Sequence, residues 1–342
     1  MLCVLAAAGV LLCMAGTAGA ASIRYTGDGL QYKADDATGH EVEAFVTGRT
    51  LTLIDTAAEA FDRPLPTGCT ELTLDLGVGA DCSLPGNVTL RIKLGAGDDY
   101  VAASDLPTRV DLDVDTGDGI NAVEGGSGDD YIVGGSDGDT LFGGPGSDII
   151  RAGDGFNFVH GNSGTDVITT GDDMDFIFGD ASDDVISSGG DFDFVYGGGG
   201  NDVVYGGADS DYLSGGSGND YILGAGGDDE INGGTGVDNV DGGNGADLIR
   251  VRDGAGDTIQ CGAGKDVARV DAGEVDRAKK SCETVVQYDS TVVDPEDEFD
   301  VEDESVEEAV DAVDQHTGNG GHVHGPRWFR NHRNHHGHHH GR

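Results

Sequence analysis

An aliphatic residue recurs every nine positions through the middle of the chain. The register holds without a slip over residues 116–250, which make fifteen copies, and the eighth place is Val, Ile or Leu in every copy. Glycines and aspartates separate one apolar segment from the next. Short apolar runs between such breaks are typical of β-strands. The pattern therefore predicts an array of short, similar units that can share one core.

The sixth place of the copies is as regular as the eighth. It holds Asp or Asn in all fifteen copies, while Gly is frequent at the first, second and fourth places. One isolated copy spans residues 94–102, and a further copy begins at Cys261. Gly takes positive φ and permits close backbone approach. Each copy thus combines residues that allow a tight backbone conformation with a carboxylate or amide at a fixed place.

The net charge of the chain indicates which kind of partner the repeats bind. The 342 residues include 64 Asp and Glu against 19 Lys and Arg, which gives a formal net charge of −45. Such a chain is normally disordered, unless stacked repeats share a core that no single copy could build. Nucleic acid is excluded as a partner, because its phosphates would be repelled. Cations are the expected partners of so many carboxylates.

The phrase G-G-x-G-x-D-x-U-x, with U aliphatic, resembles the calcium-binding nonapeptide of RTX, or haemolysin-type, proteins. The resemblance implies an all-β fold, a right-handed parallel β-roll (a solenoid) in which two copies make one turn. It also implies that several Ca²⁺ ions lie between stacked turns, held by sixth-place side chains and main-chain carbonyls. The metal ligands implied in this way are Asp99, Asn121, Asp130, Asp139, Asp148, Asn157, Asp166, Asp175, Asp184, Asp193, Asp202, Asp211, Asp220, Asp229, Asp238 and Asp247.

On this fold, the cation is needed for folding. Each copy buries one aliphatic side chain, which does not clearly offset the entropy lost by nine residues rich in glycine. Carboxylates eighteen residues apart would lie about 5 Å apart, one strand spacing. At an effective dielectric constant near 20, each such pair would repel by roughly 3 kcal/mol. We therefore expect an array that is disordered without calcium and folds on binding it.

Alternate copies fall on opposite sides of such a roll and form two rows. Row I starts at Gly125, Gly143, Gly161, Gly179, Gly197, Gly215 and Gly233, and row II starts at Thr116, Gly134, Ala152, Thr170, Ser188, Gly206, Gly224 and Gly242. Only row II has Asp at the fourth place, as Asp137, Asp173, Asp191 and Asp209. Because this departs from the family pattern, calcium binding in row II stays an open question.

Row II also carries aromatic residues at outward places. At place seven, Phe158, Phe176, Phe194 and Tyr212 are spaced to stack as a ladder; places nine and five add Phe142, Phe178, Tyr196, Phe156, Met174 and Phe192. The first interpretation is that aromatic rows stabilise a sheet face. The second is a contact surface for a protein partner or a second copy of the chain.

The first twenty residues are apolar and end in Ala18-Gly19-Ala20, which predicts a cleaved secretory signal peptide; a retained anchor is the alternative. We expect a secreted, extracellular protein, or one associated with the cell surface, without a transmembrane segment. Four cysteines remain after cleavage, and export favours disulfides. Of the three possible connectivities, the favoured one joins Cys69 to Cys82 and Cys261 to Cys282.

These patterns divide the chain into five segments. Residues 1–20 are the signal peptide, 21–115 a β-rich N-terminal part, 116–250 the array, 251–290 a cap with a disulfide, and 291–342 a disordered tail. The tail is acidic and then His-rich, and it holds nine of the eleven histidines. Neutral imidazole binds Zn²⁺, Ni²⁺ or Cu²⁺, so the tail is either such a site or a solvated segment.

The expected function is a calcium-binding structural or interaction module that is not an enzyme. The nonapeptides account for the acidic residues of the array without a catalytic role, and no H-E-x-x-H motif occurs. The alternative is a secreted calcium-dependent enzyme, such as a hydrolase, with its activity in residues 21–115. A hydrolase would show a convergent pocket with perturbed acids outside the repeats.

Overall fold

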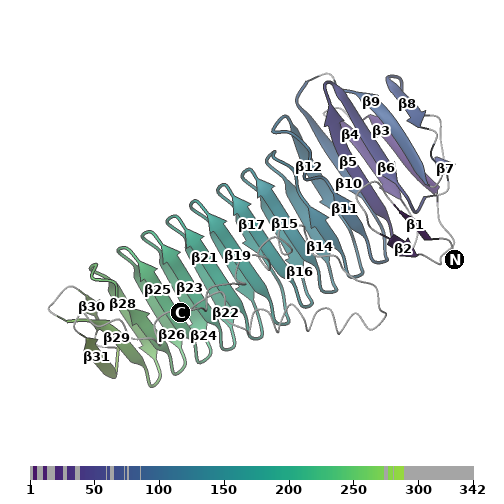
Figure 1. The fold of residues 1–342 in the computed structure, drawn as a ribbon. Coiled ribbons are helices and arrows are strands. Elements are labelled where there is room, and N and C mark those ends of the chain that lie inside the picture. Colours follow the sequence, from purple (N-terminus) through teal and green to yellow (C-terminus); the bar gives the residue numbers. More distant parts are fainter. Residues whose placement is uncertain are drawn as a thin grey trace, which may run out of the picture. The chain divides into compact units, whose positions relative to one another are not determined.

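Two long β-sheets face each other along the protein (Figure 1). A computed structural model describes residues 20–288, apart from 26–28, 35–38, 59, 62–64, 73, 75–76, 85, 273–275 and 280. It also describes two short antiparallel strands, β1 (Cys3–Leu5) and β2 (Leu11–Cys13). The remainder of the predicted signal peptide and the acidic and His-rich tail lie outside the described residues. The chain divides into two units, Met1–Thr291 and Val292–Arg342, and only the first is described below.

Each sheet runs from the N-terminal part through the array to the cap. Sheet I has fourteen strands in the order β7 (Ala60–Phe61), β3 (Ala20–Tyr25), β4 (Gly29–Ala34), β10 (Val88–Lys93), β12 (Val110–Asp115), β14 (Tyr131–Gly135), β16 (Ile149–Gly153), β18 (Val167–Thr169), β20 (Val185–Gly189), β22 (Val203–Ala208), β24 (Tyr221–Gly226), β26 (Asn239–Asn244), β28 (Thr258–Ala263) and β30 (Arg277–Ala278).

Sheet II has fifteen strands. Their order is β8 (Cys69–Leu72), β9 (Val78–Ser83), β6 (Thr50–Asp55), β5 (Glu41–Thr47), β11 (Tyr100–Ala102), β13 (Ala122–Glu124), β15 (Thr140–Pro145), β17 (Phe158–Ser163), β19 (Phe176–Ala181), β21 (Phe194–Gly199), β23 (Tyr212–Ser217), β25 (Glu230–Thr235), β27 (Leu248–Val251), β29 (Val267–Asp271) and β31 (Thr284–Tyr288). The aliphatic places of row I lie in sheet I and those of row II lie in sheet II.

The strands of the array pair in parallel with a register of eighteen residues. In sheet I, Ile132 pairs with Ile150; in sheet II, Val159 pairs with Ile177. Two nonapeptides therefore make one turn, and the solenoid has about eleven turns. The isolated copy joins the same stack through Val101, which pairs with Val123 across a longer offset of twenty-two residues. The predicted all-β parallel β-roll is confirmed.

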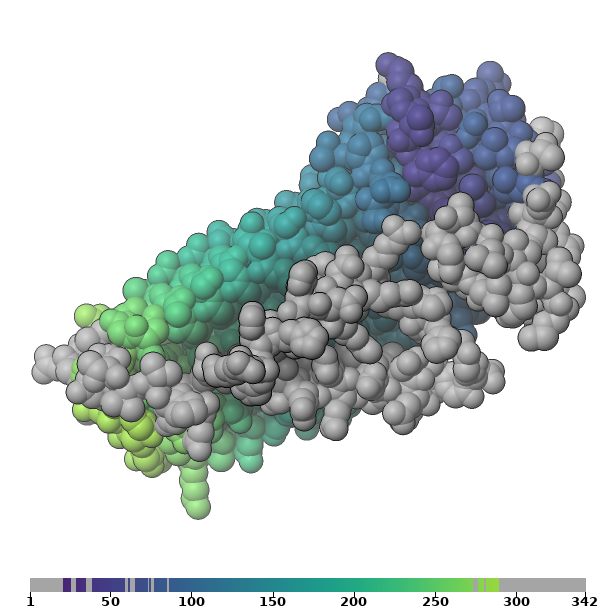
Figure 2. Space-filling view, in the orientation of Figure 1, coloured from purple at the N-terminus to yellow at the C-terminus, as the bar shows by residue number. Residues whose placement is uncertain are grey.

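The core of the array is one residue deep on each sheet. All fifteen eighth-place side chains are 0% exposed, so the predicted line of aliphatic residues is the core. The N-terminal part has a broader core, in which Leu30, Leu51, Leu90 and Leu106 are also buried. The first unit is correspondingly wider at its N-terminal end than along the array (Figures 1 and 2). The array therefore buries less apolar surface per residue than the part that precedes it.

The N-terminal part extends both sheets with antiparallel pairs. Strands β3 and β4 pair antiparallel in sheet I, and β5, β6, β9 and β8 pair antiparallel in sheet II. Alternate residues of β5 are buried, which is the period-two pattern that its sequence predicts. The strand-rich N-terminal part expected from the sequence thus contains a set of antiparallel strands. The first parallel strands, β10 and β11, pair with β4 and β5 of this set.

Two disulfides join neighbouring segments. Cys69 in β8 is bonded to its pairing partner Cys82 in β9, and Cys261 in β28 is bonded to Cys282, just before β31. This confirms the connectivity that the sequence favours. Within the part of the chain that the structure describes, no helix is long and apolar enough to cross a membrane.

Candidate metal-binding turns

The sixth-place side chains form a hydrogen-bonded ladder along each row. Oδ1 accepts the backbone N–H of the sixth residue one turn earlier, as from Asp130 to Asp148 (2.7 Å) and from Asp175 to Asp193 (2.8 Å). The ladder of row I begins at the N–H of Leu112, and that of row II begins at the N–H of His40. The structure therefore brings every residue of the predicted ligand set into one of two lines.

The second carboxylate oxygen in these ladders is buried without a hydrogen-bond donor. The predicted ligand residues are 0–3% exposed. A buried carboxylate oxygen without a partner is costly, so these atoms require a positively charged ligand or a proton. Among the described residues, this holds for Oδ2 of Asp99, Asp139, Asp148, Asp166, Asp175, Asp184, Asp193, Asp202, Asp211, Asp220, Asp229, Asp238, Asp247, Asp257 and Asp266.

Burial raises the pKa of these carboxyls. It brings the pKa of Asp148 and Asp184 to about 8 and that of Asp193 to about 7, from an ordinary value of 3.8. Desolvation is the largest cause, and the N–H on Oδ1 opposes it. Carboxylates one turn away add to it, as Asp130 and Asp166 do for Asp148. The negative charge of the turns is therefore unfavourable until a bound cation offsets it.

The two Asn turns show what surrounds the second side-chain atom. In Asn157, Nδ2 donates to the carbonyls of Gly155 (2.7 Å) and Gly153 (3.1 Å), the fourth and second places of its own turn. In Asn121, Nδ2 donates to the carbonyls at the same two places. The sixth-place side chain and two main-chain carbonyls thus converge inside the turn.

The donor set of these turns suits calcium. Calcium takes six to eight oxygen ligands from carboxylates and carbonyls. Within the described residues, no three His, Cys, Asp or Glu side chains form a metal-binding cluster. A cation in these turns would therefore take part of its ligands from the main chain, such as the carbonyls of places two and four. Carboxylate and carbonyl oxygens fit a hard, oxygen-seeking ion.

Glycine at the fourth place lets neighbouring turns stack. Gly218 has a φ of +140°, and a Cβ there would lie 1.5 Å from the carbonyl oxygen of Gly200 in the preceding turn. At the third place, by contrast, a Cβ on Gly226 would meet nothing closer than 3.9 Å. Gly at this place thus permits the close approach of one turn to the next at a φ near +140°, whereas Ser182 and Asp173 occupy the same place in other copies at φ values of 83° and 80°.

The fourth-place aspartates of row II leave the hydrogen-bonded ladder unchanged. Asp173, Asp191 and Asp209 adopt left-handed φ values of 65–80°, which Asp tolerates better than most residues. Together with Asp137 they are exposed. Their charge still reaches the turn, because Asp137 raises the pKa of Asp139 and Asp209 raises that of Asp211. The departure from the family pattern therefore keeps the ladder and adds negative charge beside the sixth-place carboxylates.

Two buried aspartates of the cap region were not in the predicted set. Asp257 and Asp266 accept the N–H of Asp238 and Asp247, and both have a buried Oδ2 without a donor. The pKa of Asp257 rises to about 6, chiefly through desolvation. A one-residue insertion before Asp257 breaks the strict nonapeptide register. For this reason Asp257 was not assigned to a sixth place from the sequence. The copy at Cys261, however, had already placed Asp266 at a sixth position.

The aromatic residues on the outer face of sheet II stack at two places. At place seven, Phe176 and Phe194 stack at 4.7 Å between ring centroids. At place nine a longer stack forms, with centroids 4.5–5.4 Å apart and ring planes within 8°, through Phe142, His160, Phe178 and Tyr196. The place-seven ladder predicted from the sequence is thus less regular than the stack at place nine, which includes a histidine.

Most of these rings are buried although they lie on an outward face. Phe158, Phe176, Phe178, Tyr196 and Tyr212 are only 4–8% exposed. At the fifth place, Met174 is 38% and Phe192 41% exposed. The exposed apolar surface of row II is therefore confined to a few fifth-place side chains.

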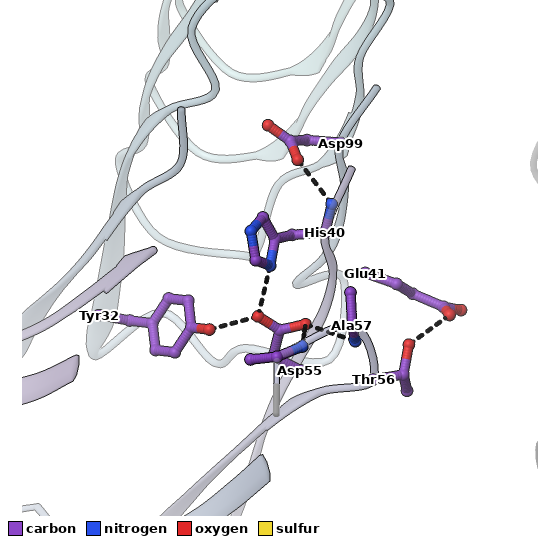
Figure 3. Close-up of polar contacts among 8 residues, drawn as sticks. Tyr32, His40, Glu41, Asp55, Thr56, Ala57 and Asp99 are labelled. Carbon is purple, nitrogen blue, oxygen red and sulfur yellow. Dashed lines mark hydrogen bonds and ion pairs between the residues drawn. The ribbon is translucent and has the colours of Figure 1, made fainter. Parts of the chain in front are cut away.

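A buried polar cluster terminates the row II ladder in the N-terminal part (Figure 3). Oδ2 of Asp55 contacts Nδ1 of His40 at 2.8 Å and accepts a hydrogen bond from the hydroxyl of Tyr32. Its Oδ1 accepts the backbone N–H of Ala57 at 2.8 Å. The backbone N–H of His40 in turn donates to Oδ1 of Asp99 at 2.7 Å. His40 thus supplies the donor that a preceding nonapeptide supplies elsewhere.

The cluster does not have the form of an open catalytic site. Tyr32, His40 and Asp55 are each 1% exposed, so a substrate cannot reach them in this structure. The carboxylate of Asp55 binds several donors, and these contacts hold the first turn of the roll against the antiparallel strands. The contact between Asp55 and His40 therefore has a structural role.

Comparison with known proteins identifies the repeats. The family model of the RTX calcium-binding nonapeptide repeat matches six overlapping segments, residues 115–150, 142–177, 160–195, 178–213, 187–222 and 214–249. Together they span the array that was recognised from its period. No curated protein matches the chain.

Proposed function

We propose that the RTX nonapeptide repeats matched over residues 115–249 bind calcium, and that calcium holds the roll together turn by turn. The observation that carries the proposal is the line of buried Oδ2 atoms without donors. The ligands we propose are the fifteen aspartates that have such an atom, together with carbonyls of the same turns. Both rows are included, because the aspartates of each row have the ladder hydrogen bond on Oδ1 and a buried Oδ2 without a donor.

The protein's own residues prepare the turn for the ion. The N–H of the preceding turn holds Oδ1 of each aspartate, as Asp130 does for Asp148, and so orients the carboxylate with Oδ2 inward. The glycines allow the carbonyls to face the same space. A bound calcium ion supplies the positive charge that offsets the buried carboxylates of successive turns. The stacked turns then carry the two sheets, which we propose serve as a structural or interaction module.

Calcium titration with an ion count tests the proposal. We expect the purified protein, stripped of metal and then titrated, to bind many calcium ions per chain, as measured by calorimetry and elemental analysis. Alanine at Asp184 and Asp202, two adjacent ligands of row I, should lower the count. The matched control is Asp183→Ala, which removes an exposed neighbour of Asp184. A protein that binds no calcium, or a count that is insensitive to both changes, would contradict the proposal.

Secretion is proposed on separate grounds. The support is the apolar first segment ending in Ala18-Gly19-Ala20 and the two disulfides, which persist in oxidising compartments. An extracellular or cell-surface location also supplies millimolar calcium, which weak turn-by-turn sites need. We retain the division into signal peptide, N-terminal part, array, cap and tail as the working organisation.

For the aromatic face we propose a stabilising role within the sheet. Phe176 and Phe194 take part in four aromatic contacts. Aromatic pairs contribute about 0.5–1.5 kcal/mol each, so replacing both residues by Ser should lower the free energy of unfolding by roughly 2–6 kcal/mol. Sedimentation should stay unchanged. The control is Val167→Ser with Val185→Ser, exposed place-seven residues of row I. A shift in sedimentation caused by the aromatic variant alone would instead assign this face to self-association.

A further inference from the structure

Two turns at the start of row II differ from the rest by a single atom. Asn121 and Asn157 are 1% and 0% exposed, and their Oδ1 atoms accept the ladder bonds from Asp99 (3.0 Å) and Asp139 (2.9 Å) as an aspartate would. Only the second atom changes, from a carboxylate oxygen to an amide nitrogen. The stacking of the turns is therefore the same, and the chemistry inside the turn is not.

The amide nitrogen satisfies the carbonyls that face it. Nδ2 of Asn157 donates to Gly155 and Gly153 at 2.7 and 3.1 Å, and Nδ2 of Asn121 to Gly119 and Gly117 at 2.8 and 3.3 Å. An amide has two N–H donors, one for each carbonyl. In an aspartate turn the same carbonyls face a negative oxygen, and a cation is needed between them. The asparagine turn has its donors built in.

In the first turn of row I, at Asp130, the second side-chain atom also has a hydrogen-bond partner within the protein. Oδ2 of Asp130 accepts the backbone N–H of Gly126 at 2.6 Å. Asp130 is thus the one predicted aspartate ligand, among the described residues, whose Oδ2 is not left without a donor. The first array turn of each row, at Asn121 and Asp130, is therefore closed by donors from the protein.

We propose that Asn121 and Asn157 take the place of ligand–cation pairs, and that Asp130, whose Oδ2 accepts the N–H of Gly126, depends less on a cation than the other aspartates, so that the array begins with turns that fold without calcium. These turns adjoin the N-terminal part with its broad apolar core. In row II the two asparagines also separate the carboxylates of Asp99, Asp139 and Asp175, so no two of them are neighbours in the ladder. The strands at the start of the array are then already folded without calcium, and the later turns pair with them when calcium binds. The proposal rests on the calcium-binding function proposed above.

Hydrogen exchange of the unaltered protein tests the first part. In excess chelator we expect the amides of residues 117–130 to retain protection, at least tenfold above those of residues 175–229, and calcium to protect both. Equal loss of protection in the two segments would overturn the proposal. This measurement requires no variant and so does not depend on how a substitution folds.

An exchange of Asn and Asp tests the second part. Asn157→Asp should add about one bound calcium ion per chain, because it replaces the donor nitrogen by a carboxylate oxygen. The matched control, Asp175→Asn in the next turn of the same row, should remove about one. An unchanged calcium count in Asn157→Asp would overturn the inference while leaving the calcium function intact. If the unaltered protein bound no calcium, the function itself would fail.

Discussion

We expect the array to lose its parallel β-structure in excess chelator and to regain it in millimolar calcium. The reason lies in the interior of the turns, where fifteen buried carboxylate oxygens have no donor. Their desolvation raises their pKa values, to about 8 for Asp175 and Asp211. At neutral pH the folded array would therefore have to accept either buried negative charge or bound protons. A chain with a core one residue deep cannot offset that cost along its whole length.

Circular dichroism in chelator and in calcium measures this coupling. We expect most of the β-signal of the array to disappear without calcium, while a remainder from the N-terminal strands and the first turns persists. Magnesium serves as the control ion, because it demands a compact octahedral site and gives up its waters reluctantly. It should restore much less structure at equal concentration. The same β content in chelator and in calcium would show that folding and binding are independent.

We expect Gly218→Ala to hinder the stacking of one turn on the next. Its Cβ would lie 1.5 Å from the carbonyl oxygen of Gly200, at a φ of +140° that residues with a Cβ rarely adopt. An unfavourable backbone conformation alone costs about 1–2 kcal/mol for such a residue. The turn must also shift to remove the overlap. We expect the calcium concentration at half-folding to rise by roughly tenfold or more, since 1.4 kcal/mol corresponds to a factor of ten.

The matched control for this variant is Gly226→Ala. Gly226 is at the third place, and its Cβ would approach no atom closer than 3.9 Å. Both substitutions add one methyl group to a row of the same array, so a difference between them reports the close approach of turns. Calcium titration followed by circular dichroism measures both. An equal effect of the two variants would refute the steric explanation for the fourth-place glycine.

Much of this fold could be predicted from the sequence because a repeat limits the possible arrangements. The period of nine, with its aliphatic eighth place, resembles the RTX nonapeptide, and this resemblance implied a parallel roll that buries the aliphatic residue at every copy. It also implied the eighteen-residue register, which the pairing of Ile132 with Ile150 confirms. The sixth-place aspartates follow too, because identical turns in register place identical side chains in line.

Other features of the site could not be predicted, because they depend on partners far apart in the chain. The contact of His40 with Asp99 joins residues fifty-nine positions apart. A single inserted residue removed Asp257 from the strict period, although the fold absorbs it and keeps the ladder bond. The exposure of Asp137 also depends on the direction in which its turn points, which composition does not specify.

The sequence by itself determined the period and, through its resemblance to the RTX nonapeptide, the roll, its register, its core and the residues that line its turns, because each of these repeats with the period. Only the tertiary structure decided which side-chain atoms have a donor and which have none. Nδ2 of Asn121 donates to the carbonyl of Gly119, and Oδ2 of Asp130 accepts the N–H of Gly126, whereas Oδ2 of Asp148 has no partner. The physical reason is that hydrogen bonding depends on distances of a few tenths of an ångström between atoms of the main chain and side chains, which a pattern of residue types does not contain.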